Sequence, residues 1–409
     1  MNEQSLFDRY DVSPLLKKIV DGIAMSAAAN APFQVHLQNL NGSSPVFVLQ
    51  HIFTHPQTAT YNHVIVLNDA EEAAYFYNSI ESITGAMDLF YFPSSFKTSQ
   101  NFNLLNPSHV MLRTEALTKL SMGGNKKIVV TYPEAFFEKV IMPKTLQENI
   151  IQIKTNDTLG LNDLMERLIQ YDFERTDFVY EPGQFALRGG IFDIYSFGNE
   201  KPYRVELFGE EVDSIRLFDP ETQLSERKLL QVNIIPNVTT QFEDTIKIPF
   251  MEFVPEHTVV WLKDWTLIQQ RGNDQMEALE AFLLHAPILK ITDDADTHKK
   301  NTDKDDFVPV DAVVEQVLKR PIIEWGFQAN LTKQKLAFST QVQPSFNRQF
   351  QYLIANLQEY EKKGYDLFLF AEQAKQLERL HAIFTDLKTE IQFTPIVKNI
   401  HEGFIDHDH

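Results

Sequence analysis

The stretch that decides the fold is YDFERTDFVYEPGQFALRGGIFDIYSFGNEKPYRVELFGEEVDSIRLFDPETQLS, residues 171–225. Short apolar segments alternate here with Pro-Gly, Gly-Gly, Gly-Asn, Gly-Glu and Asp-Pro pairs. Such pairs at short, regular intervals are typical of turns between strands. The pattern therefore predicts a small, mostly antiparallel β domain with strands at 173–180, 184–188, 191–197, 203–208 and 212–218.

Both flanks of this block predict a different architecture. Apolar strands alternate there with helices, which favours a mainly parallel α/β sheet. The expected strands are 64–67, 87–92, 127–131 and 258–262, and the expected helices are 70–83, 134–140 and 274–284. Because the β-rich block lies between two segments with the same α/β pattern, we predict that it is an inserted domain. We also predict that the two flanking segments join in space.

These patterns divide the chain into four parts. We expect residues 1–144 and 241–335 to form the two halves of one α/β domain, 145–240 the inserted β-rich domain, and 336–409 a small α/β domain. Within them, the polar stretch 293–306 predicts a solvated loop or linker. The final HEGFIDHDH has no terminating element after it. We therefore expect a solvated tail and a chain that is the front part of a longer protein.

Composition excludes several classes of function. The 409 residues include 56 acidic and 37 basic side chains, giving a formal net charge of −19. This balance predicts weak binding to duplex DNA, because phosphate recognition needs clustered Lys and Arg. The absence of cysteine excludes disulfides, thiolate zinc sites and cysteine nucleophiles. No signal peptide or apolar run of ~18–20 residues is present, so the expected location is cytoplasmic.

One stretch has the position of a phosphate-binding loop. In NLNGSSP, residues 39–45, Gly42, Ser43 and Ser44 lie between an apolar segment and the next expected element. A working loop would need an earlier glycine and a lysine that reaches the outer phosphates, and both are missing. Pro45 also removes a backbone N–H. We interpret the stretch as an ordinary turn or a degenerate phosphate loop, and expect no bound ATP or Mg²⁺.

Other catalytic and metal-binding patterns are weak. No G-x-S-x-G or HExxH occurs, and paired carboxylates such as Glu210-Glu211 fall in turns. His51 and His55 have helical spacing, but Pro56 follows at once. We therefore predict no catalytic residues and no metal site.

Arginines in the β-rich block suggest a protein interface. Exposed arginines among aromatic residues on a rigid sheet have the composition of interface anchors. The candidates are Arg175, Arg188 and Arg204, with Phe185 and Tyr195 nearby. The alternative is that these arginines only form internal salt bridges, with Asp172, Asp177, Asp193 or Glu206 as partners.

The decisive stretch also resembles a known module. It is similar to the second domain shared by the excision-repair protein UvrB and the transcription-repair coupling factor (Mfd) family. The matching motifs are Y-x-x-x-R, G-x-F-x-x-R-G-G, I-x-D-I-Y, PYRVELFGEEVDSIR and FDPETQ, and YPEAF at 132–136 fits the flanking domain. A UvrB would carry an intact phosphate loop, so the degenerate loop favours the N-terminal, UvrB-like region of a coupling factor.

The resemblance has clear implications for fold and function. It implies a degenerate RecA/helicase-like α/β domain split by an insert that recruits UvrA and so links a stalled RNA polymerase to nucleotide excision repair. UvrA would bind through Arg175 and Arg188, helped by Arg204, although Ala186 stands where UvrB has a further arginine. The family's ATP-dependent DNA translocase motor and polymerase-binding domain would lie beyond residue 409. The alternative function is a nucleotide-driven helicase or a UvrB-type excision-repair enzyme domain.

Overall fold

The computed structural model describes residues 3–26, 32–239, 242, 245–285, 300–347 and 349–409. A seven-stranded parallel sheet with the spatial order β19-β1-β18-β17-β2-β6-β3 forms the centre of the body. Its strands are β1 (Gln34–Gln38), β2 (Asn62–Val66), β3 (Leu89–Phe92), β6 (Ile128–Thr131), β17 (Thr258–Lys263), β18 (Ile322–Trp325) and β19 (Gln334–Ala337). This confirms the predicted α/β fold with a mainly parallel sheet.

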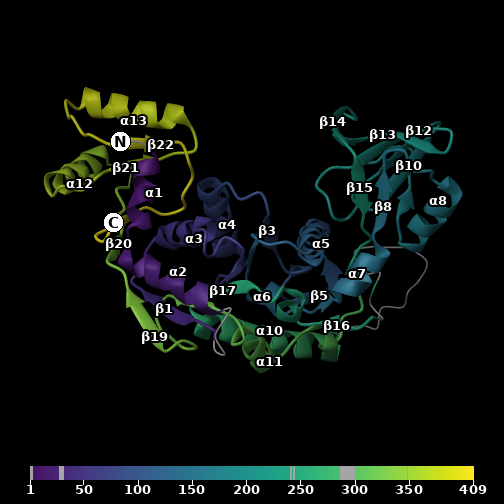
Figure 1. Ribbon diagram of the computed structural model, residues 1–409, viewed down its shortest axis with the longest axis horizontal. Helices are drawn as coiled ribbons and strands as arrows, with labels where there is room; N and C mark the ends of the chain where they lie inside the picture. The colour runs from purple at the N-terminus through teal and green to yellow at the C-terminus, as the bar shows by residue number, and fades with distance from the viewer. Residues whose placement is uncertain (1–2, 27–31, 240–241, 243–244, 286–299, 348) are drawn as a thin grey trace.

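Strands from the two flanks of the β-rich block meet inside this sheet. β17, which follows the block in sequence, pairs in parallel with β2, which precedes it, in the register Thr258↔Asn62 to Leu262↔Val66. The apolar side chains of both strands are buried in one continuous core. The flanking segments therefore form a single body, and the block between them emerges from its side (Figure 1).

Helices and short strands complete the body. They are α1 (Glu3–Asp11), α2 (Pro14–Ser26), α3 (Ser44–Thr54), α4 (Ala70–Thr84), β4 (Phe96–Thr98), β5 (Asn101–Leu105), α5 (Pro107–Ser121), α6 (Pro133–Phe136), β7 (Val140–Ile141), α7 (Pro143–Asn149), β16 (Lys247–Ile248), α9 (Phe250–Phe253), α10 (Trp265–His285), η1 (Lys304–Asp306) and α11 (Val310–Val317). As expected, α4 begins after Asp69, whose side chain accepts the Glu72 N–H. Its end is fixed by Gly85 in the left-handed conformation.

Two predicted helices have different lengths from those expected. α10 begins at Trp265, well before residue 274, because Trp265 and Ile268 add a first buried turn. The helix expected at 134–140 ends at Phe136. Phe137 and Glu138 are both buried, and the chain turns there into β7. The helical ladder stops here because the Lys139 N–H donates to the Asp306 carbonyl of a distant segment.

The inserted block, residues 151–234, is built on a six-stranded sheet with the order β14-β13-β12-β11-β10-β9. Its elements are β8 (Ile151–Lys154), α8 (Leu161–Gln170), β9 (Glu174–Arg175), β10 (Gln184–Arg188), β11 (Ile191–Ile194), β12 (Tyr203–Phe208), β13 (Glu211–Phe218), β14 (Ser225–Leu229) and β15 (Gln231–Ile234). β10 to β14 are antiparallel as predicted. β9 is shorter than the expected strand and runs parallel to β10.

The two chain passages between body and block pair with each other twice. β8 enters the block and pairs antiparallel with β15, which leaves it. Closer to the body, β7 pairs antiparallel with β16. We call these two ladders the neck. They explain how a long insertion leaves the parallel sheet intact, because its ends are held together where they depart.

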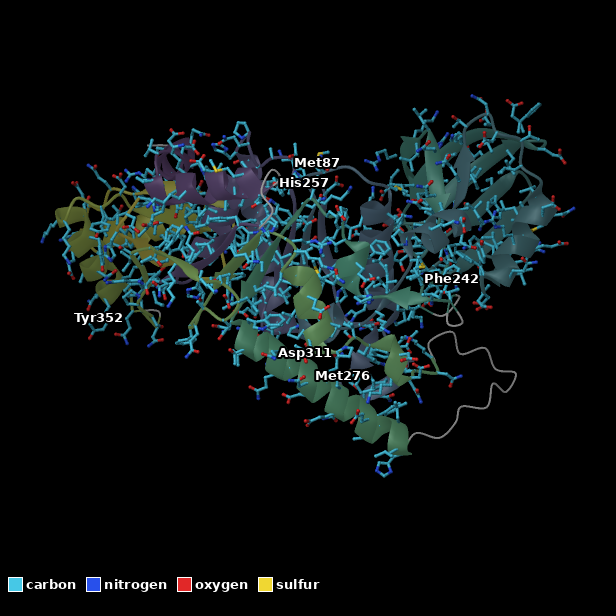
Figure 2. All side chains as sticks on the ribbon, turned by 60° about the horizontal axis from the view of Figure 1, so that its bottom comes forward. Met87, Phe242, His257, Met276, Asp311 and Tyr352 are labelled. Atoms are coloured by element: carbon cyan, nitrogen blue, oxygen red, sulfur yellow. The ribbon has the colours of Figure 1, made fainter. Side chains whose placement is uncertain are left out.

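The C-terminal residues 340–409 form a terminal unit at the opposite end of the body from the inserted block (Figures 1 and 2, where Tyr352 marks it). It contains β20 (Thr340–Val342), α12 (Phe350–Lys362), β21 (Phe368–Phe370), α13 (Ala374–Asp386), β22 (Thr394–Ile396) and β23 (Phe404–Asp406). β21 pairs in parallel with β22, and β20 pairs antiparallel with β23.

Two segments that were expected to be solvated are packed against the body. In the last residues, Phe404 lies against Phe47 with ring centroids 5.4 Å apart, and the Tyr10 hydroxyl donates to Asp406. In the predicted linker, residues 293–299 lie outside the described part of the chain, whereas Lys300 and Asp306 are buried. The polar composition of these segments predicted that they are exposed to solvent. Instead, ion pairs and aromatic contacts with other parts of the chain bury their side chains.

No helix in the described ranges is both long and apolar enough to cross a lipid bilayer.

A buried histidine makes the body sensitive to acid. His63 on β2 is fully buried, and its Nδ1 accepts a hydrogen bond from Trp261 Nε1 at 3.0 Å. Burial lowers the pKa of His63 to about 3. An unfolded histidine has a pKa of about 6.5. The unfolded chain therefore binds one more proton between these two pH values, and stability falls as the pH drops below about 6.5.

We predict that the variant His63→Asn, which keeps an acceptor for Trp261, removes this pH dependence. Between pH 6 and 5 the wild type should lose about 1 kcal/mol more of its free energy of unfolding than the variant. Urea unfolding followed by tryptophan fluorescence measures this loss, because Trp261, Trp265 and Trp325 all lie in the body. Equal slopes for the two proteins would contradict the assignment.

Candidate protein-binding surface

One face of the inserted sheet carries paired charges instead of apolar side chains. Phe192 and Ile194 of β11 point into the core shared with α8. Asp193 between them faces the other side, because side chains alternate along a strand. Cross-strand pairing extends this side from Asp193 to Arg204 and then to Arg216. We call Arg188, Asp193, Arg204, Glu206 and Arg216 the arginine face.

Asp193 is the centre of the arginine face. It is fully buried and binds two guanidinium groups. Arg204 contacts it in a bidentate arrangement, with Nε 2.8 Å from Oδ1 and Nη2 2.9 Å from Oδ2. Arg188 Nη2 lies 2.5 Å from Oδ2. The bonds from Asp193 raise the pKa of Arg204. The two charge-assisted contacts hold both guanidinium groups in fixed positions.

Arg188 and Arg204 differ in how much they offer to a partner. The side chain of Arg188 is 32% exposed, whereas that of Arg204 is 13% exposed. Arg188 also donates to the Asp177 carbonyl at 3.2 Å and stacks over the Phe178 ring at 4.3 Å. Arg204 stacks over buried Phe218 and donates to the Gln223 carbonyl. Arg188 is therefore the accessible end of the cluster, and Arg204 mainly supports it.

A second carboxylate organises the far side of the arginine face. Glu206 Oε2 accepts from the Ser214 hydroxyl at 2.5 Å and lies 3.4 Å from Arg216 Nη2. The internal salt bridges considered from the sequence are thus present for Arg188 and Arg204 with Asp193. They do not exclude binding, because Arg188 remains partly exposed beside an exposed aromatic ring.

The two aromatic residues named from the sequence do not form the surface. Phe185 is fully buried in the core beneath α8, so it presents no area to a partner. Tyr195 is also buried, with its hydroxyl donating to the Glu200 carbonyl. The prediction that these two rings contact a partner is therefore wrong, because both are packed inside the block. Phe185 belongs to the core beneath α8, whereas Tyr195 packs in a separate small cluster with Val179, Ala186 and Phe218. The sequence showed aromatics close to arginines, but it did not show which segments would cover them.

The exposed aromatics come from the segment that joins β9 to β10. Phe178 is 48% exposed and Tyr180 is 55% exposed. The sequence pattern predicted a strand at 173–180 and indicated no role for these two rings. The available signal was their position just before Pro182-Gly183, where a turn projects side chains into solvent.

Arg175 lies apart from Arg188. It is exposed on β9 and pairs in register with Phe185, whose side chain points towards α8. Paired residues of neighbouring strands point to the same side, so Arg175 and Arg188 lie on opposite sides of the sheet. Both belong to the edge segment 174–188, and only a partner that wraps this edge would contact both.

The stretch predicted as a degenerate phosphate loop joins β1 to α3. Gly42 has a φ of +55°, and a Cβ at this position would lie 2.6 Å from the Gly403 carbonyl oxygen. The Ser43 N–H donates to the Glu402 carbonyl at 3.1 Å, and the Glu402 N–H donates to the Ser43 hydroxyl at 3.1 Å. Ser44 begins α3 and is buried. The terminal unit therefore lies directly on this loop and uses its Ser43 donor.

The two histidines with helical spacing lie at the end of α3, His51 within the helix and His55 at its C-cap. His51 and His55 have ring centroids 5.5 Å apart, and His51 Nδ1 lies 2.9 Å from Asp11 Oδ1. Within the described ranges, no group of three or more His, Cys, Asp or Glu side chains is arranged to hold a metal ion.

Comparison with known proteins agrees with the sequence motifs. Residues 151–239 match the family model of the UvrB interaction domain. A transcription-repair-coupling factor of Bacillus subtilis is 28% identical over 262 residues, which are 64% of this chain and 20% of that protein. Those of Staphylococcus epidermidis and Haemophilus influenzae are 30% and 26% identical over 42% and 33% of this chain, and 14% and 12% of their own lengths. The matched region thus spans at most about a fifth of these relatives.

We predict that Asp193→Ala destabilises the inserted block by about 3 kcal/mol, because it leaves Arg204 poorly solvated without its carboxylate. Hydrogen exchange of the full chain, read over residues 184–208, measures the local opening free energy. Asp213→Ala is the matched control, because Asp213 is exposed on the same sheet. Equal protection in both variants would show that Asp193 does not organise the face.

Proposed function

We propose that this chain, which resembles the UvrB-like N-terminal region of the transcription-repair coupling factors, is a non-catalytic module that recruits UvrA through its inserted block. Recruitment would bring UvrA to a stalled RNA polymerase and start transcription-coupled nucleotide excision repair. The observation that carries the proposal is a rigid, partly exposed arginine, Arg188, in the region matched by the UvrB interaction domain.

Preorganisation makes Arg188 a suitable anchor. Asp193 and the Asp177 carbonyl fix its guanidinium, and Phe178 supports its flat side. A fixed guanidinium loses little side-chain entropy when it binds, and its remaining donors match a carboxylate in a forked geometry. Exposed Phe178 and Tyr180 add apolar area beside this charge. This combination favours a protein partner with an acidic, partly apolar surface.

We propose that the other steps of repair are carried out by parts of a longer protein and not by this chain. RNA polymerase, duplex DNA and ATP would be bound by other parts of a longer protein that contains an ATP-dependent DNA translocase. The competing proposal, a nucleotide-driven helicase or UvrB-type enzyme domain, requires a working phosphate loop. Residues 39–45 lack the lysine, and the Ser43 N–H already has the Glu402 carbonyl as acceptor.

We predict that Arg188→Ala lowers the affinity for UvrA at least about tenfold, because a central interface arginine contributes well over 1 kcal/mol. Arg175→Ala should weaken binding in the same direction. Arg188→Lys should recover little of the loss, since an ammonium group does not reproduce the forked contact. Titration of UvrA against each purified variant measures these effects.

The control for this titration is Arg227→Ala. Arg227 is exposed on β14, at the opposite edge of the inserted sheet, and should bind UvrA as the wild type does. Circular dichroism checks that every variant is folded. If folded Arg188→Ala and Arg175→Ala proteins both keep wild-type affinity, the proposed site is wrong. If the wild type does not bind UvrA, the proposed function is wrong.

We also predict that the chain neither binds nor hydrolyses ATP. Without a lysine, the loop cannot neutralise the charge on the outer phosphates. Titration with a fluorescent ATP analogue in the presence of Mg²⁺ should show no saturable signal, and phosphate release should stay at background. Saturable Mg²⁺-dependent turnover that is lost in Ser43→Ala would support the enzyme proposal instead.

A further inference from the structure

A short irregular segment supports Arg188 on the arginine face. Residues 177–181, here called the aromatic segment, lie between β9 and β10 and carry the exposed rings of Phe178 and Tyr180. The Asp177 carbonyl accepts from Arg188 Nη1 at 3.2 Å, and the centroid of the Phe178 ring lies 4.3 Å from Arg188 Cζ. The position of this segment therefore decides how firmly the Arg188 guanidinium is oriented.

Side chains, rather than a strand ladder, hold the aromatic segment in place. The backbone N–H groups of Tyr180 and Glu181 donate to Gln184 Oε1 at 2.9 and 3.1 Å. The Val179 carbonyl, in the middle of the segment, accepts from Gln223 Nε2 at 3.1 Å. Gln184 belongs to the neighbouring strand β10, whereas Gln223 reaches the segment from the distant turn between β13 and β14.

The middle of the aromatic segment also closes a small apolar cluster. Val179 is fully buried against Ala186, Tyr195 and Phe218. Ala186 pairs in register with Asp193, so the cluster lies on the arginine-face side of the sheet. Apolar burial and the hydrogen bond to the segment's backbone therefore act at the same point.

Gln223 joins separate parts of the block through one residue. Its Nε2 donates to the Val179 carbonyl and, at 2.7 Å, to the Pro220 carbonyl of its own turn. Its backbone carbonyl accepts from Arg204 Nη1 at 3.0 Å. Arg204 in turn binds Asp193, which also holds Arg188. Gln223 thus connects the aromatic segment to the carboxylate at the centre of the arginine face.

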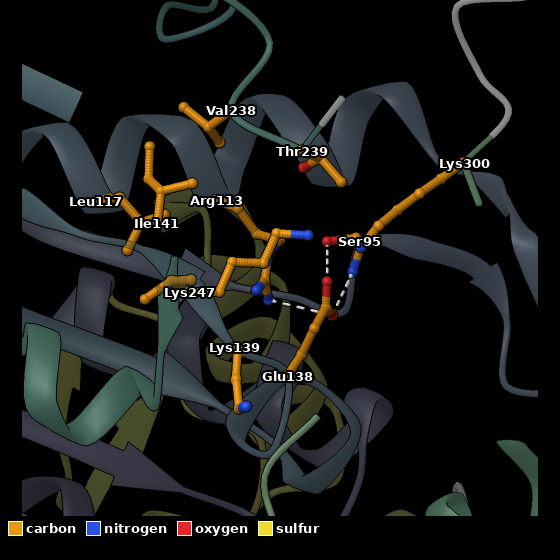
Figure 3. Close-up of a pocket in the computed structure, with 11 residues that line it drawn as sticks. Ser95, Arg113, Leu117, Glu138, Lys139, Ile141, Val238, Thr239, Lys247 and Lys300 are labelled. Atoms are coloured by element: carbon orange, nitrogen blue, oxygen red, sulfur yellow. Dashed lines mark hydrogen bonds and ion pairs between the residues drawn. The ribbon is translucent and has the colours of Figure 1, made fainter. Parts of the chain in front are cut away.

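Local costs at Gln223 distinguish it from a purely structural link. Its φ is +60°, in the left-handed region, and its buried Oε1 has no hydrogen-bond partner among the described residues. By contrast, Glu138 beside the neck also joins separate segments, but Ser95 and Arg113 satisfy both of its oxygens (Figure 3). A strained backbone and an unpaired buried acceptor at one residue are typical of positions where function outweighs local stability.

We propose that Gln223 is the positioning residue of the Arg188 anchor. Its amide latches the aromatic segment, which holds Phe178 and the Asp177 carbonyl against the guanidinium. The inference rests on the proposed function, in which Arg188 binds UvrA, and Gln223 acts through the segment without contacting UvrA. When the latch is broken, only molecules with a closed segment are competent to bind, so the apparent affinity falls by that fraction.

This role has a kinetic signature that a direct contact lacks. A smaller closed fraction lowers the association rate constant and leaves the dissociation rate constant unchanged. Loss of a contact inside an interface mainly raises the dissociation rate constant. Gln223→Met removes the amide donors without adding charge. Gln223→Asn keeps an amide and suits the left-handed backbone, but it is one methylene too short to latch the segment.

The first measurement needs no partner. Hydrogen exchange of the full chain over residues 178–181 should be at least about tenfold faster in both Gln223 variants, because the segment opens locally. Exchange in β11 should not change. Gln170→Met is the matched control, since Gln170 is exposed at the end of α8 on the other side of the sheet. Gln223→Asn also provides the test if Gln223→Met does not fold.

The second measurement is the kinetics of UvrA binding to the full chain. Gln223→Met should associate about fivefold more slowly and dissociate as the wild type does. In a Phe178→Ala background the same change should slow association by less than about twofold, because the ring that the latch positions is absent. Gln170→Met should match the wild type in both rate constants.

The outcomes separate the latch from the proposed function. Unchanged exchange over residues 178–181 in both folded Gln223 variants overturns the latch. Faster dissociation with normal association, or a full additional effect in the Phe178→Ala background, overturns the positioning role. If the wild type does not bind UvrA, the proposed function fails and the anchor role fails with it, while the exchange data still decide whether Gln223 holds the segment.

Discussion

The parallel pairing of β17 with β2 is the constraint on which the rest of the structure depends. These strands are neighbours in the sheet although the whole inserted block lies between them in sequence. A folded insertion can interrupt a sheet in this way only when its ends lie close together. The β8–β15 and β7–β16 ladders meet that requirement with backbone hydrogen bonds. The neck therefore lets two cores coexist, one in the body and one in the block.

Buried carboxylates then give the charged surfaces their geometry. Asp193 orients Arg188 and Arg204 on the inserted sheet, while Asp306 draws Lys247 and Lys300 together beside the neck. Both carboxylates are almost inaccessible to water, which strengthens their bonds to neighbouring cations. The same arrangement at the two places has different consequences. The side chain of Arg188 stays 32% exposed, whereas those of Lys247 and Lys300 are 13% and 4% exposed.

The terminal unit gives the β1–α3 loop a structural role. Its backbone at Glu402 bonds to Ser43, and Gly403 approaches Gly42 too closely for any side chain there. Phe47, Phe370 and Phe404 form an aromatic contact next to the loop. A loop of this kind in a nucleotide-binding domain keeps its N–H groups free for phosphate. Here the chain's own backbone is the acceptor, so the loop joins two parts of one molecule.

Local patterns in the sequence determined the strands, the turns and the absence of a phosphate-binding lysine, because each depends on residues that are neighbours along the chain. Alternation in residues 184–218 and the cap at Asp69 were sufficient for the sheet and helix found there. Only the tertiary structure decided that Phe185 and Tyr195 are buried, that Phe178 supports Arg188, and that Lys247 meets Lys300. The physical reason is that burial and ion pairing depend on segments brought together by the fold, and no local pattern records which side of a strand another segment will cover.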